Sequence, residues 1–232
     1  MKTLFITLLM IFTGLTAAAE HFEMTFGEFN ELQVVDGINV DYHCDPSMAG
    51  KVVFDCDPTK ASLVMFEPSG EKLSVKLTIR DTKETGLPTI HVYSSYLTKV
   101  ENDGDSTVRV LSTTPGPKLQ AKLVGNGRLS VRDVKVTNLE AELITGKGII
   151  AVSGTAKVAQ LKIIGVGQIQ ADELRADVVK ATLTGTGTIN CYPIEALNTS
   201  GMGPGKVIYR GKPKVTRSGL KMVKAVSADL PQ

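Results

Sequence analysis

Residues 139–191 read LEAELITGKGIIAVSGTAKVAQLKIIGVGQIQADELRADVVKATLTGTGTINC, a stretch that repeats one pattern three times. In each repeat, a Gly-x-Gly separates two runs in which every second residue is apolar. Alternation with a period of two predicts strands with one buried face, because successive side chains of a strand point to opposite sides. Each repeat is therefore predicted to be a strand, a glycine corner and a second strand.

The pattern continues in both directions, with corners at spacings of 21, 19, 20 and 16 residues. The predicted corner glycines are Gly125 and Gly127, Gly146 and Gly148, Gly165 and Gly167, Gly185 and Gly187, and Gly201 and Gly203. Such a unit cannot bury its apolar side alone, whereas stacked units share a continuous core. The sequence predicts a β-solenoid of about six or seven coils, each of about twenty residues. Glycine is expected at the corners because the backbone bends there through positive φ.

One corner also matches a different motif. Gly146-Lys147-Gly148-Ile149-Ile150-Ala151 fits the glycine-rich fingerprint of dinucleotide-binding proteins. That fingerprint needs a helix that opens at the glycines and receives the pyrophosphate on its N–H groups. Here β-branched residues follow without a helical period, so nucleotide binding is not expected. No other cofactor motif is present in the sequence.

The composition agrees with a chain made of strands and turns. Aromatic residues make up 5% of the 232 residues, Trp is absent and 22 residues are glycine. This composition disfavours a helical bundle and favours short strands with tight turns. The formal net charge of +2 is close to balance and does not indicate a nucleic-acid partner.

The first nineteen residues have the pattern of a secretory signal peptide. Lys2 precedes an apolar run from Leu4 to Leu15, and small residues end with Ala19. Cleavage is expected before Glu20, which predicts an exported protein, periplasmic or extracellular and associated with the outer membrane. The first cysteine is Cys44, so a lipoprotein is not expected. No later apolar run is long enough to cross a membrane.

The rest of the chain is predicted to have three parts. Residues 20–112 form an irregular amino-terminal part, residues 113–215 form the regular repeats, and residues 216–232 form a basic tail. The segment Thr113-Thr114-Pro115-Gly116-Pro117 is the expected hinge between the two halves. Residues 59–66 are expected to contain one short helix.

Three sets of motifs resemble a known family. They are Gly37-Ile38-Asn39 with its flanking strands, Thr89–Tyr93 with the later Asn102–Asp105, and the closing stretch Val207–Val215. Together they resemble the auto-transporter adhesin family that is known by its head GIN domain, over residues 26–215. The resemblance implies an all-β, right-handed parallel β-helix and an adhesin-like function. It brings no catalytic residues to carry over.

A polar cluster is expected on two strands of the irregular part. If Val40 and Tyr42 face the core, then Asp41 and His43 face outward, and the same argument places His91 and Tyr93 outward on a later strand. Should the two strands be neighbours, these residues form an exposed site for ligand binding or acid–base chemistry. A solvated sheet face is the simpler alternative.

Cys44 and Cys56 lie on two predicted strands that flank a turn, and both share the parity of inward apolar neighbours. Two interpretations stay open: Cys44 and Cys56 are two small core residues, or they form a disulfide between neighbouring strands. Cys191 is left without a partner in either case.

Two further clusters carry charge. Glu101, Asp103 and Asp105 stand at a glycine-containing corner and suggest either grouped carboxylates of a polysaccharide-cleaving β-helix enzyme or a calcium site. Common turn formers are the plainer interpretation.

The carboxy-terminal residues Arg210, Lys212, Lys214 and Arg217 suggest an anionic partner. The first three alternate, so a single strand would project all three from one side.

These observations lead to one functional expectation with two alternatives. The expected function is that of an exported, adhesin-like protein, not an enzyme, that presents a β-solenoid surface to a glycan or a cell-envelope protein. The alternatives are a carbohydrate-active β-helix enzyme and a structural envelope component without a small ligand. No metal site is expected.

Overall fold

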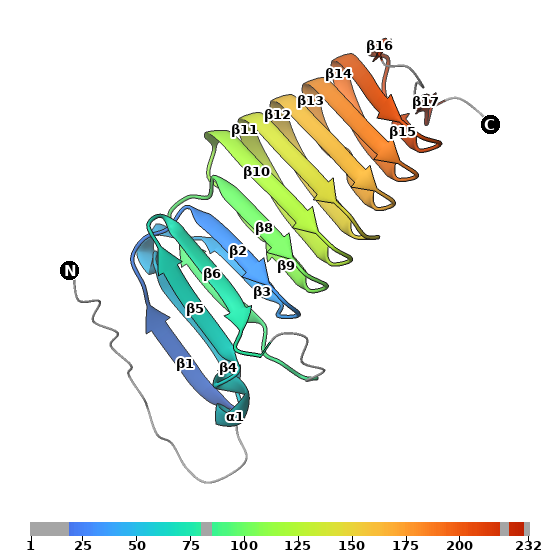
Figure 1. Ribbon diagram of the computed structural model, residues 1–232. Helices are drawn as coiled ribbons and strands as arrows, with labels where there is room; N and C mark the ends of the chain where they lie inside the picture. Colours follow the sequence, from blue (N-terminus) through green and yellow to red (C-terminus); the bar gives the residue numbers. More distant parts are fainter. Residues whose placement is uncertain (1–18, 80–84, 219–222, 230–232) are drawn as a thin grey trace.

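The computed structural model describes residues 19–79, 85–218 and 223–229. Strands and the turns between them make up nearly all of this structure (Figure 1). The predicted signal peptide lies outside the described residues apart from Ala19. The predicted basic tail is described at 216–218 and 223–229.

The predicted β-solenoid is confirmed, with about six turns and coils about twenty residues apart. The regular part consists of β10 (Gly116–Val124), β11 (Arg128–Ile144), β12 (Ile149–Gly165), β13 (Gln168–Gly185) and β14 (Thr188–Met202). Each of these strands pairs in parallel with the next. The register places equivalent repeat positions side by side, for example Leu139 beside Ala159 and Ala159 beside Val179. The twenty-residue sequence period is thus the length of one coil.

Each long strand bends, so that it contributes to two faces of the solenoid. Face A consists of β10, the second parts of β11 to β14 (138–144, 158–165, 178–185 and 196–202) and β16 (Lys214–Ser218). Face B consists of the first parts of β11 to β14 (128–131, 149–152, 168–171 and 188–191), β15 (Lys206–Tyr209) and β17 (Lys224–Ser227). Residues 134–136, 154–156 and 174–176 form a third, short side between them. The glycine corners join face A to face B.

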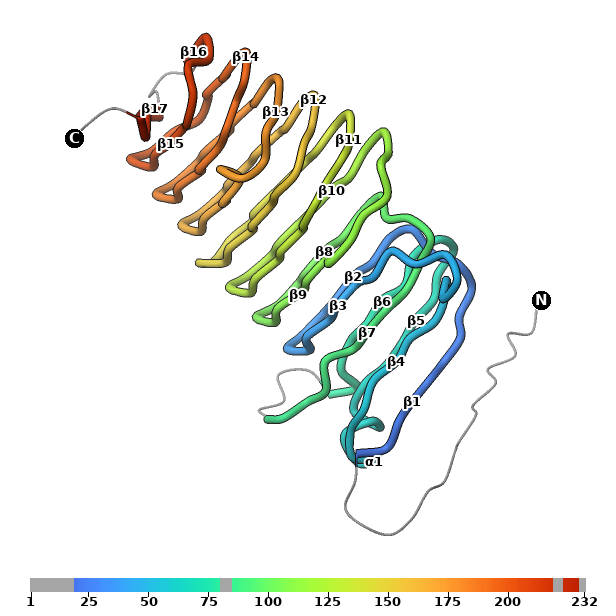
Figure 2. The backbone as a smooth tube through the Cα atoms, turned by 180° about the vertical axis from the view of Figure 1, so that it is seen from behind, coloured from blue at the N-terminus to red at the C-terminus, as the bar shows by residue number. Residues whose placement is uncertain are grey.

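The irregular part continues both faces, but its coils do not stack in chain order. Face A continues through β8 (Lys99–Asp103), β2 (Glu31–Val35), β6 (Lys72–Leu77) and β5 (Val64–Ser69). Face B continues through β9 (Thr107–Val110), β3 (Val40–Cys44), β7 (Ile90–Ser94), β4 (Lys51–Cys56) and β1 (Glu20–Thr25). The coil of β2 and β3 therefore lies between those of β6–β7 and β8–β9, as Figure 2 shows from behind.

The amino-terminal end of the solenoid is covered by antiparallel strands. β1 pairs with β4, β4 with β7 and β5 with β6 in the antiparallel sense. Two short helices lie in this region, η1 (Pro46–Met48) and α1 (Pro58–Ala61). The helix expected within residues 59–66 is thus shorter and earlier than predicted, because β5 already begins at Val64.

The core is a single apolar cluster that runs through the irregular and the regular coils. Leu123, Leu143, Ile163 and Leu183 occupy equivalent inward positions in four successive coils and are fully buried. Each such side chain contributes about 1.5–3 kcal/mol by leaving water. The segment expected as a hinge, residues 113–117, separates β9 from the regular coils. The sheet is nevertheless continuous from one half to the other, because β10, which continues from this segment, pairs with β8 before it, with Ala121 beside Val100.

The two glycines of one corner are needed for different reasons. Gly165 and Gly185 have φ of +137° and +123°, as predicted for a corner. Gly167 and Gly187 have no positive φ, but a Cβ on Gly167 would lie 2.5 Å from the carbonyl oxygen of Gly148 in the preceding coil. The second glycine is therefore required by close stacking of the coils, and the prediction of positive φ was wrong for it.

The fifth corner lies two residues later than predicted. Gly201 stands beside Leu183, an inward strand position, whereas Gly203 and Gly205 approach the carbonyl oxygens of Gly185 and Gly187. The spacing from Gly185 to Gly203 is 18 residues, shorter than the preceding spacing of 20, because the third side is shorter in this coil: the pairing of β13 with β14 passes directly from Ala171–Cys191 to Arg175–Tyr192. The corner is consequently Gly203-Pro204-Gly205.

Candidate functional site

Face B brings the predicted histidine residues together. β3 and β7 are parallel neighbours, with Asp41 beside His91 and His43 beside Tyr93. Nε2 of His43 lies 3.2 Å from Nδ1 of His91, so one ring nitrogen donates a hydrogen bond to the other. The ring of His43 also stacks on that of Tyr93, with centroids 4.7 Å apart and 14° between the planes. The assumption that these strands are neighbours is therefore confirmed.

Asp41 was expected to be exposed, but it is buried. Its side chain is only 6% exposed, because Arg109 of β9 covers it. Nε and Nη2 of Arg109 donate to the two carboxylate oxygens of Asp41, both at 2.6 Å. This bidentate pair raises the pKa of the Arg109 guanidinium. The sequence contained a signal for Arg109, since it stands between the apolar residues Val108 and Val110 and therefore has outward parity.

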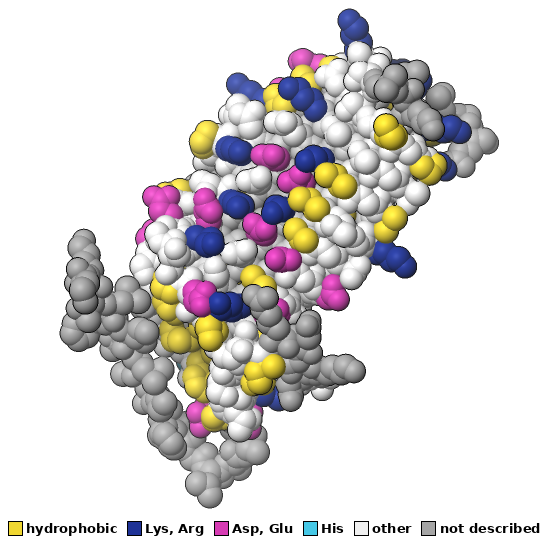
Figure 3. Space-filling model, viewed as in Figure 1, with side chains coloured by type: hydrophobic (Ala, Val, Ile, Leu, Met, Phe, Trp, Pro, Cys, Tyr) yellow, Lys and Arg dark blue, Asp and Glu magenta, His cyan; other side chains and the backbone are white. Residues whose placement is uncertain are grey.

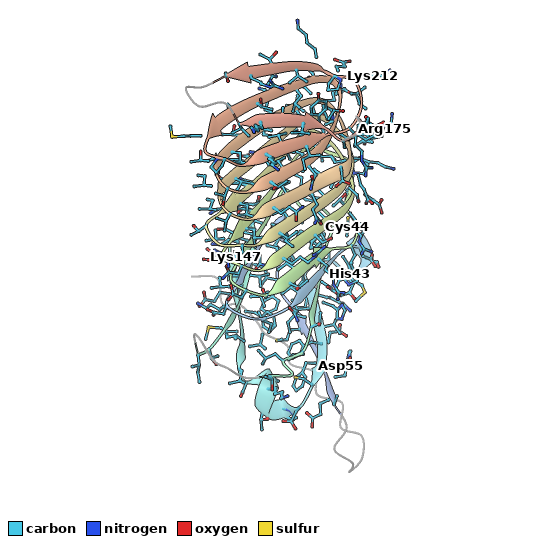
Figure 4. The ribbon with its side chains drawn as sticks, turned by 90° about the vertical axis from the view of Figure 1, so that its right-hand side faces the viewer. His43, Cys44, Asp55, Lys147, Arg175 and Lys212 are labelled. Atoms are coloured by element: carbon cyan, nitrogen blue, oxygen red, sulfur yellow. The ribbon has the colours of Figure 1, made fainter. Side chains whose placement is uncertain are left out.

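The two histidine rings are half-buried, and burial affects the protonation of His43. Burial lowers the pKa of His43, and the neighbouring His91 lowers it further. The neutral imidazole of His43 is thus favoured near pH 7, where a neutral ring can both donate and accept hydrogen bonds. Figure 4 shows His43 and Arg175 on one side of the solenoid and Lys147, from a glycine corner, on the other.

One row of outward residues connects this histidine cluster to the regular coils. Parallel pairing places the following residues side by side, one from each successive coil: His91, Asp41, Arg109, Ser130, Ala151, Gln170 and Asn190. We call this set the central row of face B. Adjacent strands lie about 4.8 Å apart, so every member of the row except Ala151 offers a polar group at this spacing.

The central row leads into a shallow groove of about 560 Å³, which sequence reasoning did not find. Ser130, Gln170 and Asn190 of the row line the groove, and Ser153 lies beside them. Its charged lining residues are Arg128, Arg132, Asp133, Asp172 and Glu173. The groove therefore combines hydroxyl, amide and charged groups of both signs.

Face A is chemically different from face B. Lys122 pairs with Glu101 at 2.8 Å, and Lys162 pairs with Glu142 at 2.6 Å, each across neighbouring coils. Figure 3 shows this face with basic and acidic side chains alternating along the solenoid and hydrophobic side chains to one side. A pocket of about 290 Å³ between β2, β6 and β8 has further charged residues, including Lys72 and Lys99. The charges of face A thus largely neutralise one another.

The carboxylates of the acidic corner do not converge. Glu101 belongs to the ion pairs of face A, whereas Oδ1 of Asp105 accepts hydrogen bonds from the backbone N and the Nδ2 of Asn126, at 3.2 and 3.1 Å. In the three described ranges of the chain, no three His, Cys, Asp or Glu side chains gather as a metal site would require. Glu101 thus belongs to a surface ion pair, and Asp105 stabilises the turn.

The basic carboxy-terminal residues do not lie on one strand, contrary to the prediction. β15 ends at Tyr209, Gly211 has a φ of +86°, and β16 begins at Lys214 on face A. The turn of Gly211 and Pro213 separates the charges. Arg210 turns back to Asp172 at 3.3 Å, and Nη2 of Arg217 donates to the carbonyl oxygen of Ala225. Lys212 lies at the far end of the solenoid (Figure 4).

Of the two interpretations of Cys44 and Cys56, the disulfide is wrong, because both are free thiols. Cys44 lies beside Ser94 of β7, whereas Val53 of the antiparallel β4 lies beside His91. The two cysteines are thereby about six residues apart along β7, or roughly 20 Å. A disulfide requires Cα atoms within about 7 Å, so the register excludes it.

Solved structures share this fold. A protein described as a putative adhesin from Bacteroides fragilis is 22% identical with a TM-score of 0.77, and the match covers 90% of this chain and 94% of that chain. For a putative adhesin from Parabacteroides distasonis the values are 19%, 0.69, 90% and 97%. For a putative lipid binding protein from Parabacteroides distasonis they are 18%, 0.63, 90% and 94%. At these identities the likeness concerns the fold alone.

A comparison with curated proteins finds no match. Within the part of the chain that the structure describes, no helix is long and apolar enough to cross a bilayer. The sequence profile of the family described as "Putative auto-transporter adhesin, head GIN domain" matches residues 28–213, which is most of the chain. The chain belongs to this family of adhesin-like proteins.

Proposed function

We propose that the protein is an exported, adhesin-like binding protein that presents face B to a glycan or another polar component of the cell envelope. The central row of face B carries this proposal, because it connects the histidine cluster to the groove through paired residues of successive coils. Face A is less suited, since its charges are already paired with one another.

The groove has the chemistry that a glycan requires. A sugar hydroxyl both donates and accepts hydrogen bonds, and so do the amides of Gln170 and Asn190 and the hydroxyls of Ser130 and Ser153. Gln170 and Asn190 lie on neighbouring coils, about 4.8 Å apart, and Ser130 lies two coils before Gln170, an arrangement that suits an extended polar chain. The charged lining, with two arginines against three carboxylates, carries no net positive charge and so favours a neutral glycan over an acidic one.

Binding without catalysis is the favoured form of this function. A polysaccharide-cleaving enzyme needs carboxylates that are free to act on the bond. Asp172, one of the three groove carboxylates with Asp133 and Glu173, is ion-paired with Arg210. At the acidic corner, Glu101 is paired with Lys122, and Asp105 accepts hydrogen bonds from Asn126. Family membership and the predicted signal peptide support export to the periplasm or the outer surface, without a lipid anchor.

A glycan array tests the proposal. Gln170→Ala combined with Asn190→Ala should weaken binding at least tenfold. Gln160→Ala combined with Asn198→Ala is the control, because these exposed amides lie on face A, two coils apart with Lys180 between them. The control should bind as the parent does.

Equal binding by the two double variants would place the partner elsewhere than in the groove. Release of reducing sugar from a bound polysaccharide would favour the enzyme instead. An array without any bound glycan, together with co-purification of envelope proteins that both variants retain, would favour a structural envelope component.

A further inference from the structure

We propose that His43 and His91 form a binding site for a divalent transition-metal ion of the class that prefers imidazole, Cu²⁺ or Zn²⁺. This site is separate from the groove, and the proposal does not depend on glycan binding. It rests on the distance between two ring nitrogens, on the way the fold fixes both rings, and on the chemistry of imidazole.

The two nitrogens are already at a distance that suits a shared metal ion. Nε2 of His43 and Nδ1 of His91 lie 3.2 Å apart. If an ion lay at the usual zinc–nitrogen distance of about 2.0–2.1 Å from both nitrogens, the N–metal–N angle would be roughly 100°. That angle lies between those of tetrahedral and square-planar coordination. The ion would replace the single proton that the two rings now share.

The fold holds the two rings in this arrangement. Each histidine is on a strand with neighbours on both sides: β3 lies between β7 and β9, and β7 lies between β3 and β4. The ring of His43 is packed against Tyr93, and both imidazoles are half-buried. Little side-chain entropy would therefore be lost on binding.

The site would have two protein ligands. Asp41 lies beside His91, but both of its carboxylate oxygens are held by Arg109. The remaining coordination positions would be filled by water or by an outside ligand. A site of two imidazoles selects Cu²⁺ over Zn²⁺, according to the usual order of affinities for nitrogen ligands.

The third histidine of the chain, His21, must be kept apart from the proposed site in the measurements. Nδ1 of His21 lies 2.7 Å from Asp55, near the amino-terminal end of the solenoid and away from His43 (Figure 4). His21 follows the predicted mature amino terminus, where the free amine and the imidazole could bind Cu²⁺ by themselves. The variant His21→Gln should therefore serve as the parent for the measurements.

Calorimetric titration of this parent with Cu²⁺ should show one equivalent of bound ion. Electron paramagnetic resonance of that complex should show two imidazole nitrogens. Adding His43→Gln or His91→Gln should weaken binding at least tenfold, while the thermal unfolding of the metal-free protein changes little. In the unmutated chain, Zn²⁺ should protect both His43 and His91 from modification by diethyl pyrocarbonate, a measurement that needs no variant.

Two results would overturn the site. One is a Cu²⁺ affinity that is unchanged by either substitution. The other is a dissociation constant of the parent for Cu²⁺ above about 1 mM, together with no protection of His43 and His91 from diethyl pyrocarbonate by Zn²⁺. The variant with Gln170→Ala and Asn190→Ala should keep its Cu²⁺ binding, because neither residue belongs to the His43 and His91 pair, so that loss of metal binding and failure of the groove are separate outcomes.

Discussion

Gly167 lies so close to the carbonyl oxygen of Gly148 in the preceding coil that a Cβ would stand 2.5 Å from it. A Cβ at this position would also lie 2.6 Å from Cδ1 of Leu143. By contrast, Gly165 of the same corner has a φ of +137°, and the nearest atom to its Cβ position is 3.5 Å away. One corner therefore separates two requirements for glycine, close stacking at Gly167 and backbone conformation at Gly165.

The variant Gly167→Ala should lower the free energy of unfolding by about 1–3 kcal/mol, because the added methyl group overpacks the coil interface. The loss should be larger for Gly167→Val. Urea unfolding measures both. Val166→Ser is the matched control, since Val166 is 49% exposed at the tip of the same corner. It should change the free energy by no more than about 0.5 kcal/mol, and a loss equal to that of Gly167→Ala would contradict the stacking argument.

The variant Gly165→Ala should also be destabilising, by about 1–3 kcal/mol, but through backbone strain. Because there is room for a side chain at this position, Gly165→Ser should cost about as much as Gly165→Ala. The same urea experiment tests the difference in mechanism. A cost that rises steeply with side-chain size at Gly165 would show that packing, not conformation, limits this site.

The regular coils could be predicted from the sequence because their pairing is local. Each strand of β11 to β14 pairs with the strand of the next repeat, so the period of the glycine corners is the coil length. The order of the irregular coils could not be predicted. β2 and β3 have the same alternation as β6 and β7, and nothing in such a pattern tells which coil inserts between which.

The candidate site was predictable only in part for a similar reason. Strand parity placed His43 and His91 outward, and a single assumption about neighbouring strands brought them together. Arg109 belongs to the next coil, so its hold on Asp41 depends on a second pairing. The groove depends on small side chains such as Ala151 and Ser153 lying beside larger ones, which becomes visible only after the coils are stacked.

Glu101 should make the stability of the protein depend on pH in the acidic range. Burial alone would raise the pKa of Glu101, but the hydrogen bond and charge of Lys122, with Lys99 nearby, outweigh it and hold the pKa below its usual value. A carboxylate with a lowered pKa in the folded state stabilises the fold above its unfolded pKa of about 4.3. This contribution is lost as the pH falls through the lower, folded pKa.

The variant Glu101→Gln should therefore reduce the free energy of unfolding by about 1 kcal/mol at pH 7 and much less near pH 3. Glu67→Gln is the control, because the Glu67 side chain is 53% exposed in its pair with Lys76. Exposed pairs contribute little, so this variant should stay close to the parent at both pH values. The argument fails if Glu101→Gln is equally destabilising at pH 7 and pH 3.

The three cysteines should differ in reactivity. Burial raises the pKa of Cys191 to about 12, with a smaller effect from Asp172, and its side chain is 1% exposed. Burial also raises the pKa of Cys56, and Asp57 adds to it. Cys44 is half-buried at the end of β3, where its Sγ donates to the carbonyl oxygen of Ser95. The thiolate is the reactive form, so we expect Cys44 to be the first thiol modified in the folded protein.

Alkylation with iodoacetamide at pH 8, followed by peptide mass spectrometry, measures this order. In the folded protein Cys44 should be labelled well before Cys56, and Cys191 should stay unlabelled until urea unfolds the chain. The same experiment tests the strand register, because it separates free thiols from a disulfide. If Cys44 and Cys56 were protected together in urea and released together by a reductant, they would be bonded. β3 and β4 would then have to shift by several residues relative to β7, which would also move His43 away from His91.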